Sequence, residues 1–308
     1  MTETQAIIEA SRRATEQNVR GALATVVRVE GSAYRRPGAR MFVTETGERT
    51  GVLSGGCLEG DVAERALKVI ETGKTVVVTY DTTSDDDIVW GLGIGCRGVV
   101  QVLIEPAVDL RLDVEPPVPL VIFGAGDDAL PLVALAQSLG WHTTVVDTRA
   151  RALTTERFAH ADEVVLCRAE EVRDRLRLTE KTVVVTMTHN YLHDLELLRT
   201  LLQTPLRYLG CLGPRQRTEK LLTELADEVS GIYLGQLYAP AGLDIGADTP
   251  TEVAFSIVAE INAVLNSREG GHLRKRKGPI HTPAPQQDEA GSFEAFESAA
   301  FQCEIAVA

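Results

Sequence analysis

The sequence predicts a two-domain α/β protein, in which an α+β unit precedes a doubly wound parallel sheet. Its 308 residues suit two domains of about 100 to 150 residues each. An acidic, proline-rich segment between Glu105 and Pro119 has the composition of a semi-rigid linker. From Leu120 onward, predicted strands and helices alternate, a pattern typical of parallel sheets covered by helices. The expected division is a first domain over 1–108, a linker over 109–118, a second domain over 119–267 and a disordered tail over 268–308.

The first domain is expected to mix helices with short strands rich in β-branched residues. Apolar periodicity predicts helices over 3–19 and 58–72, and strands over 22–29, 40–44, 49–53, 75–79 and 99–104.

The second domain is expected to alternate strands and helices throughout. The predicted strands are 120–123, 143–146, 163–166, 182–187 and 206–209, and the predicted helices are 128–139, 191–202, 217–227 and 250–266. After Arg268 no period is sustained, which favours disorder, with a short docked helix carrying Phe293, Phe296 and Phe301 as the alternative.

Composition excludes several classes of function. The formal net charge is −13, so a general nucleic-acid or anionic-membrane surface would be repelled outside local basic patches. No run approaches the roughly 18 apolar residues that span a bilayer, and the polar start lacks the features of a signal peptide. We expect a cytoplasmic protein that binds neither nucleic acid nor membrane.

The five cysteines are predicted to be free thiols. They stand at 57, 96, 167, 211 and 303, an odd number at wide spacings without a C-x-x-C pair, which fits neither a disulfide framework nor a zinc site. Cys167 and Cys211 lie in apolar surroundings and are expected to be structural.

Cys57 is the most prominent candidate for a binding residue. It follows Gly55 and Gly56 and stands at the start of a predicted helix, where backbone amides and the helix dipole favour a thiolate. The glycines let a bulky ligand approach the backbone. Glu59 in the same loop partly opposes the thiolate by its charge. The alternative is that Cys57 is a small buried apolar residue.

Two further features of the first domain extend this candidate site. Cys96 lies among glycines in the segment 91–98, next to Arg97, and is a second accessible thiol. Arg35 and Arg36 form a basic loop shortly before the Cys57 loop. If the linker folds the domains face to face, these arginines and thiols would line one cleft.

The second domain opens with a dinucleotide-binding fingerprint. The strand ending at Phe123 is followed by Gly124-Ala-Gly126-Asp-Asp-Ala129, which matches G-x-G-x-x-[GA] between a strand and a helix. Asp147 closes the next strand 21 residues beyond Gly126, where an acid bonds a ribose diol, so NAD would be preferred over NADP, although the nearby Arg149 weakens this preference. The pattern predicts a Rossmann-like domain.

Two acids complicate that prediction. Asp127 and Asp128 stand where a pyrophosphate should meet the helix N-terminus. In the alternative interpretation the glycines only permit tight strand-to-helix packing, and Asp128 is an N-cap.

Two other groups are expected at the carboxyl edge of the second sheet. His189 follows a predicted strand and is a candidate general acid or base, although an ordinary cap or core histidine is the alternative. Arg215 and Arg217 precede a predicted helix and suit a phosphate, with a solvated surface turn as the competing interpretation.

Several motifs in order resemble the XdhC/CoxI family, whose members assist maturation of xanthine and carbon monoxide dehydrogenases. The similar stretches are residues 36–41, 51–59, the Gly95–Cys96 loop running to Pro106, residues 213–215 and residues 242–250. The resemblance spans roughly residues 5–266. One departure is that many relatives have a histidine and further glycines after G-A-G, where this chain has Asp127, Asp128 and Ala129.

The resemblance implies an XdhC/CoxI-type domain joined to a Rossmann domain, and a chaperone rather than a catalyst. Such a protein would bind molybdenum cofactor, a molybdopterin, and deliver it in sulfurated form to an apoenzyme of the xanthine dehydrogenase type. A cysteine desulfurase is a further implied partner, and a homodimer is compatible with the sequence. Cys57 would contact molybdenum or its sulfur, with Cys96 second, and the four arginines would hold phosphate.

Two other functions compete with this one. An NAD-dependent oxidoreductase would place Asp147 on the ribose and His189 near the transferred hydride. A nucleotide-sensing or structural partner with a vestigial cleft would bind neither ligand.

Overall fold

The computed structural model describes residues 2–31, 33–81, 98–107, 110, 112–113, 116–226, 233–277 and 280. The predictions for Cys96 and for most of the tail lie outside these residues. In the described part of the chain, no helix has the length and apolarity needed to cross a membrane.

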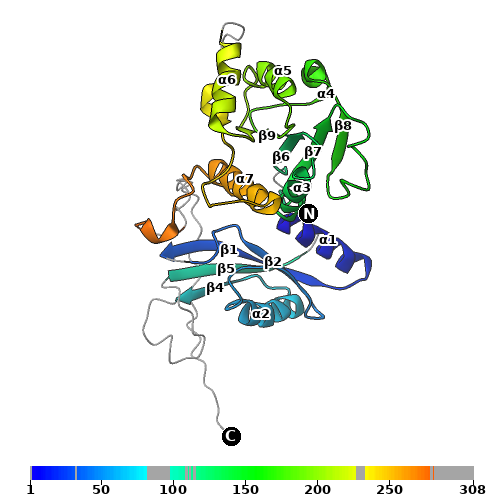
Figure 1. Cartoon of the computed structure of the whole chain (residues 1–308). Helices are drawn as coiled ribbons and strands as arrows, with labels where there is room; N and C mark the ends of the chain where they lie inside the picture. Colours follow the sequence, from blue (N-terminus) through cyan, green and yellow to red (C-terminus); the bar gives the residue numbers. More distant parts are fainter. Residues whose placement is uncertain are drawn as a thin grey trace.

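The N-terminal domain is a five-stranded antiparallel sheet with a helix against each face (Figure 1). Its strands are β1 (Gly21–Gly31), β2 (Arg40–Thr44), β3 (Arg49–Gly51), β4 (Val76–Asp81) and β5 (Gly98–Pro106), in the order β3-β2-β1-β5-β4. Helix α2 (Glu59–Thr72) buries Val62, Ala66 and Val69 against one face. Helix α1 (Glu3–Glu16) buries Ile7 against Leu23 and Phe42 on the other.

The C-terminal domain is a six-stranded sheet in which every pairing is parallel. Its strands are β6 (Pro119–Phe123), β7 (His142–Asp147), β8 (Glu163–Leu166), β9 (Val183–Thr186), β10 (Tyr208–Cys211) and β11 (Leu237–Tyr238), in the order β11-β10-β9-β6-β7-β8. This order is that of a Rossmann fold. The chain adds β7 and β8 on one side of β6, then returns to add β9, β10 and β11 on the other side.

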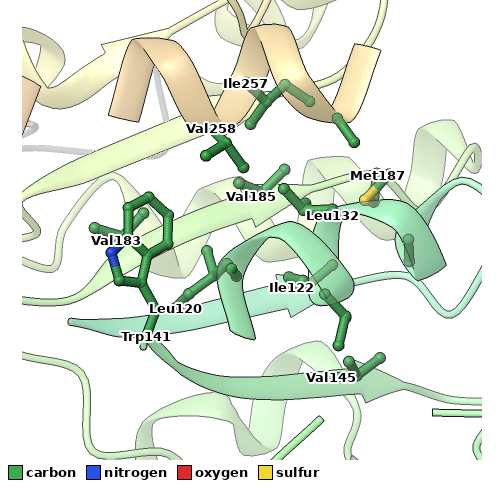
Figure 2. Close-up of a cluster of buried hydrophobic side chains, with 14 of the residues drawn as sticks. Leu120, Ile122, Leu132, Trp141, Val145, Val183, Val185, Met187, Ile257 and Val258 are labelled. Atoms are coloured by element: carbon green, nitrogen blue, oxygen red, sulfur yellow. The ribbon is translucent and has the colours of Figure 1, made fainter. Parts of the chain in front are cut away.

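Helices cover both faces of the parallel sheet. Their bounds are α3 (Ala129–Ser138), α4 (Val172–Arg175), α5 (Tyr191–Leu201), α6 (Arg215–Leu225) and α7 (Pro250–Leu265). Figure 2 shows Leu120, Ile122 and Val185 of the strands packed against α3 and α7. Alternate strand residues such as Val121 and Val184 face the cluster formed with α5 and α6. Because both faces of the sheet are buried, the sequences of these strands are continuous apolar runs.

The predicted elements agree closely with the observed ones, and the differences have local causes. Helix α1 ends at Glu16 rather than 19, because Asn18 adopts a left-handed conformation (φ 55°) that ends the helix. Helix α6 begins at Arg215 rather than 217, directly after the cap residue Pro214. The short elements α4 and β11 were not predicted, since four and two residues are too few to show a period.

Candidate functional site

A cavity of about 530 Å³ lies at the carboxyl edge of the parallel sheet, beside the switch point between β6 and β9. Open α/β sheets bind ligands at this place. The lining combines apolar side chains, among them Phe123, Val146, Cys167 and Leu197, with polar ones, among them Asp147, Arg149, Arg168, His189 and His193. The predicted site residues Gly124, Asp147 and His189 are therefore brought together.

The glycine turn after β6 is closed tightly against the turn after β9. Gly124 has φ 116°, and its N–H donates to the carbonyl of Val146 at 2.8 Å. A Cβ added to Gly124 would collide with the backbone of Met187. The first glycine of the fingerprint is thus required by packing between the two turns, whatever ligand binds there.

Asp147 uses all its acceptor positions within the protein. Oδ1 accepts from the N–H and Nε of Arg149 at 2.8 and 2.9 Å, and Oδ2 accepts from the N–H of Ala125 and from Nη2 of Arg149, both at 2.8 Å. Burial raises the pKa of this carboxyl, but these hydrogen bonds and the Arg149 charge outweigh it and lower the pKa to about 2. A ribose diol would have to displace one of these four donors, and the role of Asp147 in binding a ribose stays a prediction.

The two acids of the turn differ in their surroundings. Asp127 is 94% exposed and pairs with Arg157 at 2.5 Å. Asp128 occupies the N-cap position of α3, as the packing interpretation expected, but its side chain makes no capping hydrogen bond. The reason is its helical backbone (φ −72°, ψ −18°), because a capping side chain needs an extended residue to reach the helix amides.

Asp128 instead bonds to His189. Its Oδ2 lies 2.6 Å from His189 Nε2, while its other oxygen lies over Gly126, where an added Cβ would collide with it. The histidine side chain is 63% exposed, and the carboxylate is largely buried. An acid that orients an accessible imidazole is an arrangement suited to proton transfer or to binding a polar ligand.

The turn that carries His189 is held by its neighbours. His189 has φ 56°, a conformation that costs a non-glycine residue free energy. Thr188 Oγ1 donates to Asp194 Oδ1 at 2.6 Å, and Asn190 caps α5 by accepting from the N–H of His193 at 3.1 Å. These bonds fix the residues on both sides of His189.

Arg217 supports the same turn rather than facing a ligand. Its Nη1 lies 2.6 Å from Asp194 Oδ2, and the Asp194 side chain is only 4% exposed. A buried carboxylate needs a counter-ion, so Arg217 is committed to this pair. Its predicted partner Arg215 is exposed at the first position of α6 and remains a candidate phosphate contact.

The Cys57 loop is held by an internal acid. Glu59, the first residue of α2, accepts from the N–H groups of Leu53 and Ser54 at 3.1 and 2.7 Å and from Ser54 Oγ at 2.5 Å. Burial raises the pKa of Glu59, but the bonds from Ser54 and Leu53 lower it overall. Ser54 Oγ also accepts from the N–H of Leu58 at 3.0 Å. Glu59 therefore stabilises the loop, and its role as a ligand contact stays a prediction.

Within this loop Cys57 itself is exposed, and its Sγ lies 3.6 Å from Ser54 Oγ. Helix α2 begins two residues later, at Glu59. The interpretation of Cys57 as a buried apolar residue is therefore wrong. Cys167 and Cys211, expected to be structural, are buried.

The basic loop lies against the Cys57 loop. The ring of Tyr34 is 3.8 Å from the position that a Cβ on Gly55 would take. Arg35 pairs with Glu3 of α1, and Glu3 also accepts from the N–H of Val52 at 3.0 Å. Arg36 is exposed. These contacts place Tyr34 of the basic loop against Gly55 of the thiol loop, and the charge of Arg35 is matched by Glu3.

The predicted cleft shared between the domains is not the 530 Å³ cavity. That cavity is lined by residues of the C-terminal domain alone, and Cys57 is not among them. A joint site of Cys57 with Arg215 therefore remains a prediction.

Fold and site together define a two-domain protein, in which an exposed thiol loop precedes a Rossmann domain whose nucleotide turn is modified. Two family models match the chain: "XdhC and CoxI family" over residues 14–81 and "XdhC Rossmann domain" over residues 120–261. The chain belongs to the XdhC and CoxI family.

Similar proteins agree with this membership. A Bacillus subtilis protein described as a probable subunit of xanthine dehydrogenase is 31% identical, over 80% of this chain and 93% of its own length. The "Molybdenum cofactor insertion chaperone PaoD" of Escherichia coli is 27% identical, over 80% and 84% respectively. A crystal structure described as a xanthine dehydrogenase from Bacillus halodurans is 30% identical with a TM-score of 0.74, covering 87% of this chain and 97% of that one.

Sequence reasoning missed several lining residues of the cavity, among them Arg168 and His193, and also the partners of the residues that it did name. Neither the Asp128–His189 pair nor the Arg217–Asp194 pair was predicted. Asp128 and His189 lie 61 residues apart, and no local pattern connects them. Asp194 lies on the same face of α5 as the buried Leu197, Leu198 and Leu201. This spacing could have indicated that Asp194 is buried and that its charge needs a partner.

Proposed function

We propose that this protein is a maturation factor that binds molybdenum cofactor as cargo and delivers it, in sulfurated form, to an apoenzyme of the xanthine dehydrogenase type. The observation that carries the proposal is the similarity to a molybdenum cofactor insertion chaperone across both domains. The relative described as part of a xanthine dehydrogenase supports the class of client.

Cys57 is the proposed contact for molybdenum or for its sulfur. A thiolate is a soft ligand, and molybdenum in the cofactor already takes sulfur ligands. The thiol is exposed on a loop whose backbone is held by Ser54 and Glu59, so binding requires little ordering of the loop. Arg36 in the adjacent loop and Arg215 of α6 are the proposed phosphate contacts.

A carrier must also release its cargo. An exposed contact lets a client apoenzyme approach the cofactor while it is still bound, whereas a closed cavity would require the carrier to open first. The proposed partners are therefore a molybdenum hydroxylase apoenzyme and, for sulfuration, a cysteine desulfurase. In this proposal the protein acts as a chaperone and need not catalyse a reaction.

The first experiment measures loading. The protein is purified from cells that make molybdenum cofactor and from cells that cannot, and molybdenum and pterin are quantified per mole of protein. Both should co-purify in the first case only. Cys57→Ala should reduce both by about tenfold or more, whereas Cys211→Ala, which removes a buried thiol outside the cavity, should leave loading unchanged. Full loading of Cys57→Ala, or wild-type protein without pterin from competent cells, would contradict the proposal.

The second experiment separates delivery from sulfuration. Protein loaded with cofactor that carries an oxo group in place of the sulfido ligand is mixed with a molybdenum hydroxylase apoenzyme, a desulfurase whose persulfide carries radioactive sulfur, and a thiol reductant. The reductant supplies the two electrons that convert the persulfide sulfur to sulfide, and the displaced oxo group leaves as water. Transfer of both molybdenum and label to the apoenzyme is expected. Transfer of molybdenum without label would retain the carrier role and refute delivery of a sulfurated cofactor.

A further inference from the structure

The 530 Å³ cavity occupies the dinucleotide position of a Rossmann fold, yet its two usual anchors are filled by the protein itself. The acid at the end of the second strand of the domain, Asp147, is saturated by Arg149 and the N–H of Ala125. A sugar diol therefore finds no free acceptor there.

The second anchor is the backbone at Gly126. In a dinucleotide site the second glycine lets the pyrophosphate approach the backbone closely. Here one oxygen of Asp128 lies so close to Gly126 that an added Cβ would collide with it. A carboxylate in this position occupies the space that a diphosphate would need beside Gly126, and its negative charge repels that of the diphosphate.

The Asp128 carboxylate is held in place from the neighbouring strand turn. His189 Nε2 lies 2.6 Å from Asp128 Oδ2. The histidine turn is in turn fixed by Thr188, Asp194 and Arg217. Displacing Asp128 would therefore break a bond to a turn that is itself held by a buried ion pair.

The neighbouring acid lacks these features. Asp127 is 94% exposed and bonds to Arg157. The two acids carry the same charge and adjoin each other in sequence, so they form a matched pair for comparison. Only Asp128 is placed to decide what enters the turn.

We propose that Asp128, which adjoins this cavity through its bond to the lining residue His189, determines its specificity by excluding ligands that carry a diphosphate and admitting heterocyclic ligands that lack one. The volume suits a small organic ligand, and Phe123, Val146 and Leu197 supply apolar surface for a planar ring. Polar groups on such a ligand would meet His189, which lines the cavity and is bonded to Asp128. The inference concerns this cavity alone and does not depend on the proposed carrier function.

The test compares ADP with adenosine, which share the heterocycle and differ in the diphosphate. Binding of each is measured by isothermal titration calorimetry to wild type, Asp128→Ala and Asp127→Ala. Asp128→Ala should bind ADP about tenfold or more tightly than wild type, because one like charge near the diphosphate is removed. Asp127→Ala should match wild type, and adenosine binding should change by less than about threefold in either variant.

Two controls keep the outcome decisive. Asp128→Asn keeps the size of the side chain and removes its charge, so it should gain ADP affinity even if Asp128→Ala folds poorly. The gain should shrink at high salt, since it is electrostatic. Equal affinity of wild type and folded Asp128 variants for ADP would overturn the proposal. So would an equal gain in Asp127→Ala.

Discussion

The two glycine loops of this protein, one before α2 and one before α3, use an acid in different ways. In the first loop, Glu59 accepts from two backbone N–H groups and a serine hydroxyl of its own loop. In the second, Asp128 makes no capping bond and pairs with His189 from a distant turn. The first acid fixes its loop, whereas the second closes a ligand position.

The difference shows how one sequence signal leads to two outcomes. Both loops place glycines and an acid at the start of a helix, where the dipole favours an anion. Because Glu59 satisfies the backbone, the loop presents Cys57 to solvent at little cost. The Asp128 carboxylate is held by one side chain, that of His189, so a single substitution at His189 can change its position. We therefore expect the thiol loop to be rigid. We expect the conformation of the turn before α3 to be more easily altered by substitution.

The largest effect is expected from the Arg217–Asp194 ion pair, which supports the His189 turn that pairs with Asp128 of the second loop. Arg217→Met leaves the buried Asp194 carboxylate without its cation, which should lower the free energy of unfolding by about 3–5 kcal/mol. Arg215→Met is the matched control, since Arg215 is exposed two residues earlier, and should change it by about 0.5 kcal/mol or less. Urea unfolding measures both. Equal effects of the two variants would show that the pair does not hold the turn.

A large kinetic contrast is expected between the thiols of the two domains. Burial raises the pKa of Cys211 to about 11, so at pH 8 it holds about 100-fold less thiolate than an ordinary thiol. Iodoacetamide should therefore label exposed Cys57 at least about 100-fold faster than Cys211. Peptide mapping by mass spectrometry follows each site. Comparable rates would mean that Cys57 is protected, which would weaken its proposed role.

The next effect is the pH dependence contributed by Asp147. Its pKa in the folded protein, about 2, lies below the ordinary 3.8, so its stabilisation is fully present above about pH 4 and is lost as the pH falls toward 2. The loss should be about 2 kcal/mol. The free energies of unfolding of wild type and Asp147→Asn should therefore converge over this range. A constant difference between them would refute the assignment.

The smallest effect is expected in the thiol loop. Ser54→Ala removes the acceptor for the N–H of Leu58 and the donor to Glu59, which should cost about 1–2 kcal/mol. Ser138→Ala, which loses one exposed hydroxyl bond within α3, should cost about 0.5 kcal/mol or less. Urea unfolding again gives both values. If Ser54→Ala costs no more than its control, the loop is not held as the geometry indicates.

Local patterns were sufficient to predict most of the fold. The strands of the parallel sheet are apolar runs bounded by glycine and polar residues, and the fingerprint at Gly124 marks the first strand-to-helix turn. Asp128 stands at the N-cap position, as one interpretation of the sequence expected, but its side chain does not cap the helix. The residue type alone does not reveal the backbone conformation, which decides whether the side chain can reach the helix amides.

The candidate site was predictable only in part. The glycines before Cys57 and its place before α2 favoured an accessible thiol over a buried one, and the structure confirmed the exposure. The engagement of Arg35 by Glu3 and of Arg217 by Asp194 was not predictable, since each joins separate elements. Surface arginines in a sequence look alike, and only neighbours in space decide which remain available to a ligand.

The amino-acid sequence by itself determined the order of elements, the Rossmann class of the second domain and the placing of a thiol and a histidine in turns. These follow from periodicity and backbone preference, which act over a few residues. Only the tertiary structure decided that Asp128 faces His189 and that Asp147 is saturated by Arg149 and Ala125. Hydrogen bonds and ion pairs extend over a few ångströms, so the long parallel crossovers must form before such partners meet.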